Sequence, residues 1–281
     1  MRSLTVVLVA GALISVAGCT GPRTPDGAAP PGRPAGSAQP GGSPGPAGSG
    51  QPDGSWRRLS PAPSPRTEVT AAASGTRIVV VGGYRADAAT VATTEILDTT
   101  TGRWERGPDL PVAVNHAMAA TVGDVVYVFG GYLADSKPST AAYRLDGGAW
   151  RPTAALPEGR AAGTAVSQNG MVYVAAGVGP AGLATDMLVY DAAGDRWSRA
   201  PGPPTRREHL AGAGFGGLIY TAGGRTGGLD TNVSAVEVFD PRSRAWTALP
   251  PLPTARGGLA GAATCAGQIV VIGGEAAATF A

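Results

Sequence analysis

Arginine is the residue type whose positions first suggest a ligand site. The chain repeats a Pro-x-x-Arg segment, and one of its five copies has Val114 in place of the arginine. The other four copies end in Arg66, Arg160, Arg207 and Arg256. Guanidinium groups gathered on one rim would attract an anionic ligand, such as an acidic sugar or a carboxylate. Because the arginine recurs in most copies, we favour a structural role, in which each guanidinium bonds carbonyl groups of its own copy.

The two histidines of the chain occupy one equivalent position, two residues after the arginine position. In chain order this position holds Glu68, His116, Ala162, His209 and Gly258. Histidine departs from the repeat, so His116 and His209 are better ligand candidates than the arginines. We still favour the alternative that histidine fills an ordinary polar position on the rim at little cost.

A second set of loops adds two tyrosines, Tyr84 and Tyr132, to the expected rim. Neither a nucleophile–base spacing nor a Cys/His cluster with metal-ligand spacing is visible in the sequence. We therefore predict no catalytic residue, no metal and no cofactor. The nearest acidic pair, Glu68 with Glu275 or Asp87, is the weakest alternative.

Tryptophans mark the repeat that must position these groups. They occur at residues 56, 104, 150, 197 and 246, with spacings of 48, 46, 47 and 49 residues. Each unit contains an apolar run, and these runs are Ile78–Val81, Val126–Phe129, Val172–Ala175, Ile219–Ala222 and Ile269–Ile272. Such continuous runs predict strands that are buried on both faces. Four of the runs end in a Gly-Gly pair, and the third ends in Ala176–Gly177.

The next strand of each unit ends in a hydrophobic residue followed by aspartate, at Asp98, Asp146, Asp191 and Asp240. We expect each carboxylate to bond the following backbone amides in an Asx-type turn. Tight turns are expected earlier in each unit, at Ser74–Gly75, Gly123–Asp124, Asn169–Gly170, Gly216–Gly217 and Ala266–Gly267. Antiparallel order then places the proline-containing loops and the loops after the glycine pairs on one face.

The recurring Gly-Gly, hydrophobe-Asp and Trp features resemble the kelch repeat over residues 56–281. The resemblance implies an all-β fold, a kelch-type β-propeller with four-stranded blades around a channel and no helix. About five blades are visible. Only seven residues follow Gly274, so we expect the last blade to be incomplete and the ring to be truncated or open. In kelch-like rings an N-terminal strand often completes the last blade, and Trp56 is placed for that role.

The N-terminus predicts export. Residues 1–18 combine a positive start with a short apolar run that ends in small residues before Cys19, which resembles a bacterial lipobox. We expect a lipid on Cys19 to anchor the protein to the extracytoplasmic face of a bacterial membrane; the alternative is an ordinary cleaved signal with a chance cysteine. Residues 19–55, rich in Gly, Pro, Ala and Ser, predict a disordered linker.

Composition excludes other partners. The net charge of +2 is spread over scattered bases, with Lys137 the lone lysine, so no nucleic-acid surface is expected. Cys265, the second of two cysteines, is expected to be a small buried residue. With Cys19 lipidated, no intramolecular disulfide is expected.

We therefore predict a membrane-anchored propeller that binds a protein or a glycan. The first alternative is an enzyme that resembles kelch-type sialic acid mutarotases or, less closely, copper-radical sugar oxidases. The oxidase resemblance would require two His, two Tyr and a Cys cross-linked to one Tyr, and the chain offers His116, His209 and Cys265 without a motif that links them to a tyrosine. A further alternative is a fragment without independent function.

Overall fold

The structure of the protein is a computed structural model, and it describes residues 58–263 and 268–276. Four antiparallel sheets of four strands follow one another along the chain. The first contains β1 (Thr70–Ser74), β2 (Arg77–Val81), β3 (Thr94–Asp98) and β4 (Arg103–Arg106). The second contains β5 (Met118–Val122), β6 (Val125–Phe129), β7 (Ala142–Asp146) and β8 (Ala149–Pro152). The third contains β9 (Thr164–Gln168), β10 (Met171–Ala175), β13 (Asp186–Asp191) and β14 (Arg196–Pro201).

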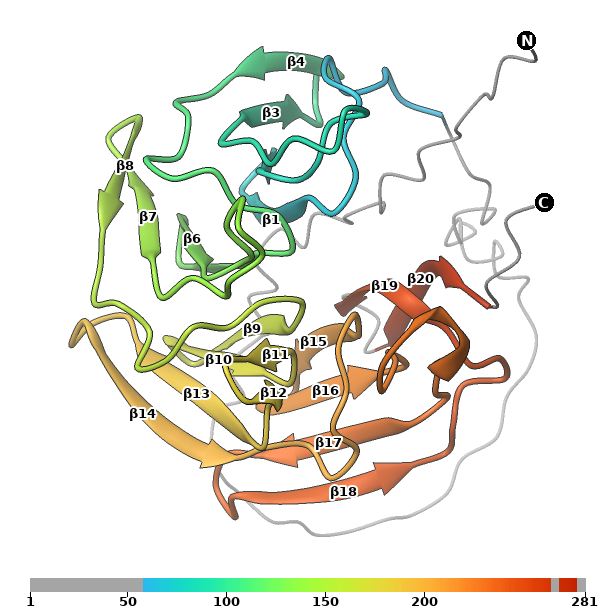
Figure 1. The fold of residues 1–281 in the computed structure, drawn as a ribbon. Helices are drawn as coiled ribbons and strands as arrows, with labels where there is room; N and C mark the ends of the chain where they lie inside the picture. The colour runs from blue at the N-terminus through green and yellow to red at the C-terminus, as the bar shows by residue number, and fades with distance from the viewer. Residues whose placement is uncertain (1–57, 264–267, 277–281) are drawn as a thin grey trace, which may run out of the picture. The chain divides into compact units, whose positions relative to one another are not determined.

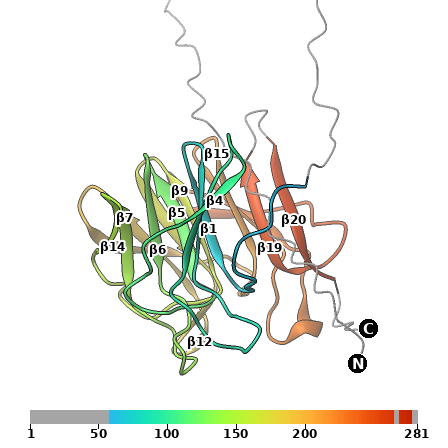
Figure 2. The same cartoon turned by 90° about the horizontal axis from the view of Figure 1, so that it is seen from above.

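The fourth sheet contains β15 (Ala211–Phe215), β16 (Leu218–Ala222), β17 (Val236–Asp240) and β18 (Ala245–Leu249). Two smaller sheets pair β11 (Val178–Gly179) with β12 (Gly182–Leu183), and β19 (Gly257–Ala263) with β20 (Ile269–Glu275). Figure 2 shows β12 beyond the ends of the blade strands, on the side where the loops after the glycine pairs project. A 3-10 helix, η1 (Leu229–Thr231), interrupts the all-β pattern, so the prediction of no helix is wrong at this loop.

The sheets are arranged as the blades of a β-propeller. The first strands of successive sheets pack side by side, β1 on β5, β5 on β9, β9 on β15 and β15 on β19. Each sheet turns its first strand inward and its fourth strand outward (Figure 1). The inner strands line a cavity of ≈ 420 Å³, which is the channel expected from the resemblance. Four of the five expected blades are therefore present as four-stranded sheets.

The hydrophobic core lies between blades. One buried cluster joins the first and second sheets, another joins the second and third, and a third joins the third and fourth. The second strands of the two middle blades, β6 and β10, face a core on both sides, and in β10 four consecutive residues, Val172 to Ala175, are buried. This confirms the interpretation of the apolar runs in these two strands. For the fifth run, Ile269–Ile272, the prediction of burial on both faces is wrong, because β20 is the outer strand of a two-stranded sheet and these residues are only half-buried.

The glycine pairs join neighbouring blades. Gly83 N–H donates to the carbonyl of Val114 (2.8 Å) in the next blade, and φ is +68° at Gly82 and +97° at Gly83. A Cβ atom on Gly82 would overlap the Val114 carbonyl oxygen, so only glycine allows this approach. The same bond is made by the second residue of three further pairs, Gly131 to Arg160, Gly177 to Arg207 and Gly224 to Arg256.

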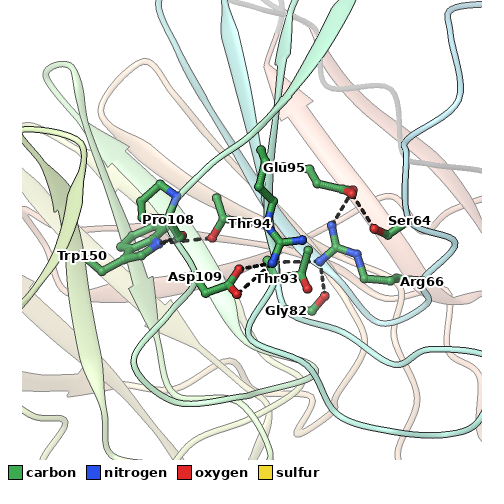
Figure 3. Close-up of polar contacts among 10 residues, drawn as sticks. Ser64, Arg66, Gly82, Thr93, Thr94, Glu95, Pro108, Asp109 and Trp150 are labelled. Atoms are coloured by element: carbon green, nitrogen blue, oxygen red, sulfur yellow. Dashed lines mark hydrogen bonds and ion pairs between the residues drawn. The ribbon is translucent and has the colours of Figure 1, made fainter.

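The repeated tryptophans also connect blades. The indole N–H of Trp150 donates to the carbonyl of Pro108 (2.9 Å) and to Thr94 Oγ1 (3.2 Å) in the preceding blade (Figure 3). Corresponding indole bonds join Trp104 to Ser60, Trp197 to Ala154 and Trp246 to Pro201. The period near 47 residues thus reflects one bond that is repeated from blade to blade.

Turn chemistry agrees with the sequence in most blades. Asp98, Asp191 and Asp240 accept hydrogen bonds from backbone amides two or three residues ahead, which confirms the Asx-type turns. At Asp146 two glycines with positive φ, Gly147 and Gly148, make the turn. The first hairpin turn is Gly75–Thr76, one residue later than predicted, because Ser74 still pairs with Arg77.

Several predictions fall on other parts of the chain. Cys19, the signal segment 1–18, the linker 19–55, Trp56, Cys265 and the turn Ala266–Gly267 lie outside the described residues. In the part of the chain that the structure describes, no helix has the length and apolar character needed to span a bilayer.

Candidate functional site

The position that contains both histidines forms a continuous line of backbone hydrogen bonds from blade to blade. His116 N–H donates to Glu68 O, Ala162 N–H to His116 O, His209 N–H to Ala162 O, and Gly258 N–H to His209 O, at 2.8–2.9 Å. All five residues have left-handed φ values between 52° and 72°. Such values are uncommon for residues other than glycine, so the bond between blades imposes this conformation.

This line brings three ionisable side chains together at the start of the inner strands. The Nε2 atom of His116 lies 3.1 Å from Glu68 Oε2, and the Nε2 atom of His209 lies 3.8 Å from the same oxygen. The two imidazole rings meet edge to face, with centroids 4.7 Å apart. Each residue directly precedes a residue that lines the channel, namely Val69, Ala117 and Leu210. The cluster, Glu68 with His116 and His209, therefore lies at one mouth of the channel.

A buried asparagine sets the tautomer of His116. Asn115 is fully buried, and its Nδ2 donates to Thr90 Oγ1 (2.9 Å) and to the carbonyl of Tyr132 (3.3 Å). The Oδ1 atom of Asn115 is then left to accept from Nδ1 of His116, at 2.5 Å. Nδ1 of His116 therefore carries a hydrogen, and Nε2 of the neutral ring presents a lone pair toward Glu68.

Burial keeps His116 neutral. Burial, assisted by the nearby charges of His209 and Arg225, lowers the pKa of His116 to about 3. Burial also raises the pKa of Glu68 above its ordinary value. His209 and Arg225 oppose that rise, whereas Glu275 and Glu208 add to it. The side chain of Glu68 is nevertheless 38% exposed, against 13% for His116 and 11% for His209, so the cluster opens to solvent on the Glu68 side.

Carboxylates and one arginine surround His209. Its Nδ1 lies 3.3 Å from Glu208 Oε1, although the geometry is not that of a hydrogen bond. The Nε atom of Arg225 lies 3.6 Å from the same Glu208 oxygen, and its Nη1 lies 3.2 Å from Glu275 Oε2. One guanidinium thus faces three carboxylates, those of Glu68, Glu208 and Glu275.

Two tyrosines complete the surroundings of the cluster. The rings of Tyr84 and Tyr132 approach His116 edge to face, with centroids 5.9 Å and 5.5 Å from the imidazole. Burial, assisted by Glu208 and Tyr84, raises the pKa of Tyr132 to about 12. Both tyrosines follow glycine pairs, and isolated bridges pair Tyr84 with Thr67 and Tyr132 with Asn115. The structure therefore places these sequence candidates beside His116.

The arginines do not form an electropositive rim, which was the alternative to a structural role. Arg66, Arg160 and Arg207 are 3%, 0% and 0% exposed. Arg66 donates to the carbonyls of Gly82 and Thr93 and to Glu95 Oε2, at 2.6, 2.8 and 2.9 Å (Figure 3). This is the structural role that the repetition favoured, because each guanidinium braces its own blade.

The other arginines brace their blades in related ways. Arg160 bonds Ala176 O, Asp186 and Glu158, and Arg207 bonds Thr205 O, Thr221 Oγ1 and Glu237. Arg256 is half-buried and donates to the carbonyl of Gly273 (3.1 Å). Of the four, Arg66, Arg160 and Arg207 have no exposed guanidinium to offer a ligand.

The shared histidine position is visible in the sequence, but the convergence of Glu68, His116 and His209 from three different blades was not predicted. The contacts of Glu208 and Asn115 with the histidines were not predicted either. A signal was present, because both contacts come from the residue just before each histidine. Asp87, one weighed partner of Glu68, instead pairs with Arg85 at 2.8 Å, and both side chains are exposed. The other, Glu275, does act on Glu68.

Comparison with known proteins agrees with this architecture. Residues 106–274 match the KLHDC2/KLHL20/DRC7 Kelch-repeats domain, and residues 65–111 match the Kelch motif. The chain is 33% identical over 141 residues to Kelch-like protein terF of Aspergillus terreus, covering 45% of this chain and 29% of that protein. It is 35% identical over 122 residues to the human Kelch repeat and BTB domain-containing protein 13, covering 42% and 26%.

A third relative is the Kelch repeat and BTB domain-containing protein 12 of Danio rerio, which is 29% identical over 154 residues, covering 48% of this chain and 25% of that protein. The chain thus spans less than a third of the length of these relatives. The fold and the site define a β-propeller with a polar cluster at the mouth of its channel. With the matched residues, the chain belongs to the kelch-repeat family.

Proposed function

We propose that this propeller is a protein-binding module that is held at the extracytoplasmic face of a bacterial membrane by a lipid on Cys19. Kelch-repeat propellers are typically protein-interaction modules. The observation that supports the proposal most directly is the convergence of Glu68, His116 and His209 on one face, with Tyr84 and Tyr132 around them. Aromatic and charged groups on a rigid scaffold are typical of partner recognition.

The charge at the cluster favours a protein over the acidic glycan that the arginines suggested. The guanidinium groups of Arg66, Arg160 and Arg207 are turned inward, and one arginine, Arg225, faces three carboxylates at the mouth. An acidic sugar would meet net negative charge there, whereas a protein segment that carries hydrogen-bond donors would be attracted.

Site-specific photocrosslinking tests the binding face. A photoreactive benzoylphenylalanine at Tyr132 should crosslink a partner in intact cells, whereas the same group at the exposed Thr100 should not, because antiparallel order places that turn on the opposite face. Equal crosslinking at both positions would contradict the proposed face. A glycan array probed with the purified chain tests the alternative. Binding to acidic glycans without any crosslinked protein would show that the ligand is a glycan and refute the protein partner.

Membrane attachment has its own test. Substitution Cys19→Ser should abolish incorporation of labelled palmitate and move the protein from the membrane fraction to the soluble fraction. Unchanged fractionation of the variant would refute the lipid anchor and leave the propeller assignment intact.

We also propose that β19 and β20 form the inner pair of a fifth blade. β19 packs on β15, and Gly258 N–H and Gly224 N–H make the same bonds between blades as their equivalents elsewhere. Arg256 bonds Gly273 O as Arg66 bonds Gly82 O. Hydrogen exchange in peptides covering β20 should then be as slow as in β16, and fast exchange in β20 alone would refute the assignment.

A further inference from the structure

Two hydrogen-bond acceptors face each other at the mouth of the channel. Nδ1–H of His116 donates to Asn115, so Nε2 of the same ring is directed at Glu68 Oε2, 3.1 Å away, and it offers a lone pair there whenever the ring is neutral. A lone pair and a carboxylate at this distance repel each other unless a proton or a cation lies between them. The arrangement is that of a ligand pair for a positive ion.

His209 supplies a third donor from another blade. Its Nε2 lies 3.8 Å from the same Glu68 oxygen, and the ligand atoms of the three side chains lie within 4.8 Å of one another. Tetrahedral ligands at about 2.0–2.1 Å from a zinc ion lie about 3.4 Å apart. The two distances to Glu68 fall on either side of this value, so on the Glu68 side the spacing suits a shared ion.

The two histidines differ in their outer contacts. Asn115 accepts a hydrogen bond from Nδ1 of His116, which directs Nε2 of that ring toward the metal and fixes its tautomer. Glu208 Oε1 lies 3.3 Å from Nδ1 of His209 without the geometry of a hydrogen bond. Arg225 lies 3.6 Å from Glu208, so that carboxylate is held beside His209, where a small rotation of the imidazole would let Nδ1–H donate to it.

The local charge favours a bound cation. The carboxylates of Glu208 and Glu275 share one guanidinium, that of Arg225, and the carboxylate of Glu68 lies beside the two histidines. The excess of negative charge would be reduced by a divalent ion bound among them.

We propose that Glu68 Oε2, His116 Nε2 and His209 Nε2 bind a divalent transition-metal ion of the zinc class at the mouth of the channel. Two imidazoles and one carboxylate form a three-ligand set that leaves a further coordination position open. The 38% exposed Glu68 side chain places that position toward solvent, where water or a partner's side chain would occupy it. This site goes beyond the proposed partner binding, and it can be tested without a partner.

The test uses the purified full chain without a histidine tag, because the chain has two histidines of its own. After dialysis against a chelator, Zn²⁺ is titrated by calorimetry, and ¹⁵N-labelled imidazole resonances are followed by NMR. One equivalent should bind per chain, both Nε2 resonances should shift, and both Nδ1 atoms should keep their hydrogens. Co²⁺ should give visible bands of a four- or five-coordinate site without a thiolate absorption.

Single variants separate this site from adventitious binding. His116→Gln and His209→Gln should each weaken Zn²⁺ binding by about 100-fold or more, and Glu208→Gln by about 10- to 100-fold, the range for outer contacts. Asp87→Asn, an exposed carboxylate on the same rim, should not change the affinity. Circular dichroism of the zinc-free proteins checks that every variant is folded.

Three results would overturn the proposal. They are no binding at micromolar Zn²⁺, binding that survives both histidine substitutions, and a thiolate absorption that disappears in Cys265→Ser. Because no step of this test involves a partner, failure of the metal site would leave the proposed protein binding standing, and failure to find a partner would leave the metal site standing.

Discussion

Substitution Arg207→Met tests the structural role assigned to the repeated arginine. Arg207 is fully buried, and it donates to Glu237 Oε2 (2.5 Å), Thr205 O (2.8 Å) and Thr221 Oγ1 (3.0 Å). Methionine would fill much of the space but leave Glu237, 4% exposed, as a buried carboxylate without a cationic partner, bonded only by Thr205. Breaking a buried pair in this way costs about 3–5 kcal/mol of the free energy of unfolding. For a domain of this size, the melting temperature should fall by about 6–20 °C.

Urea denaturation at pH 7, followed by tryptophan fluorescence, measures the loss. Arg206→Met is the matched control, because Arg206 is exposed beside the buried position, and it should change the free energy of unfolding by less than about 0.5 kcal/mol. If the slope of the free energy of unfolding against urea concentration is the same in both variants and the unsubstituted protein, the three unfold between comparable states.

A double variant separates the charge from the packing. Arg207→Met with Glu237→Leu removes the unpaired carboxylate, so it should be more stable than Arg207→Met alone. The second blade supports this expectation, since Val114 stands at the arginine position, and its Val128–Tyr143 strand pair corresponds to Thr221–Glu237. A structural role for Arg207 would be refuted if Arg207→Met and Arg206→Met had the same free energy of unfolding. It would also be refuted if the double variant lost the sum of the free energies lost by the two single variants.

Two further predictions concern backbone geometry and pH. Gly82→Ala should destabilise the protein by more than about 2 kcal/mol, because it adds a clash with the Val114 carbonyl to a left-handed φ, whereas Gly75→Ala, with open space around it, should cost about 1 kcal/mol in the same urea assay. The pKa of His116 falls from 6.5 unfolded to about 3 folded. Between these pH values the unfolded chain is protonated at His116 and the folded protein is not, so the free energy of unfolding decreases as the pH falls from 6.5 toward 3. The loss should be about 2 kcal/mol at pH 5, partly offset by Glu68, whose pKa is raised on folding. His116→Gln should remove this part of the pH dependence, and identical pH profiles for the two proteins would contradict the assignment.

Most of the fold was predictable because its determinants are local or repeat at one period. The apolar runs, the glycine pairs and the aspartate turns each act within one blade or between adjacent blades, so their residue types recur at matching positions. The structural role of the repeated arginines was predictable, but their hydrogen-bond partners were not. Glu95 and Glu237 lie on strands of their own blades about thirty residues away, and only strand pairing shows that they face the guanidinium groups.

Sequence alone determined the kelch-type blade and the equivalent position that contains Glu68, His116 and His209. Only the tertiary structure decided that these three side chains meet, because their separations along the chain, 48 and 93 residues, become short distances when the inner strands gather around the channel. Their protonation was decided in the same way. Burial lowers the pKa of His116, with help from Arg225, and raises that of Glu68 despite Arg225. Desolvation and charge interactions depend on surroundings that no stretch of sequence contains by itself.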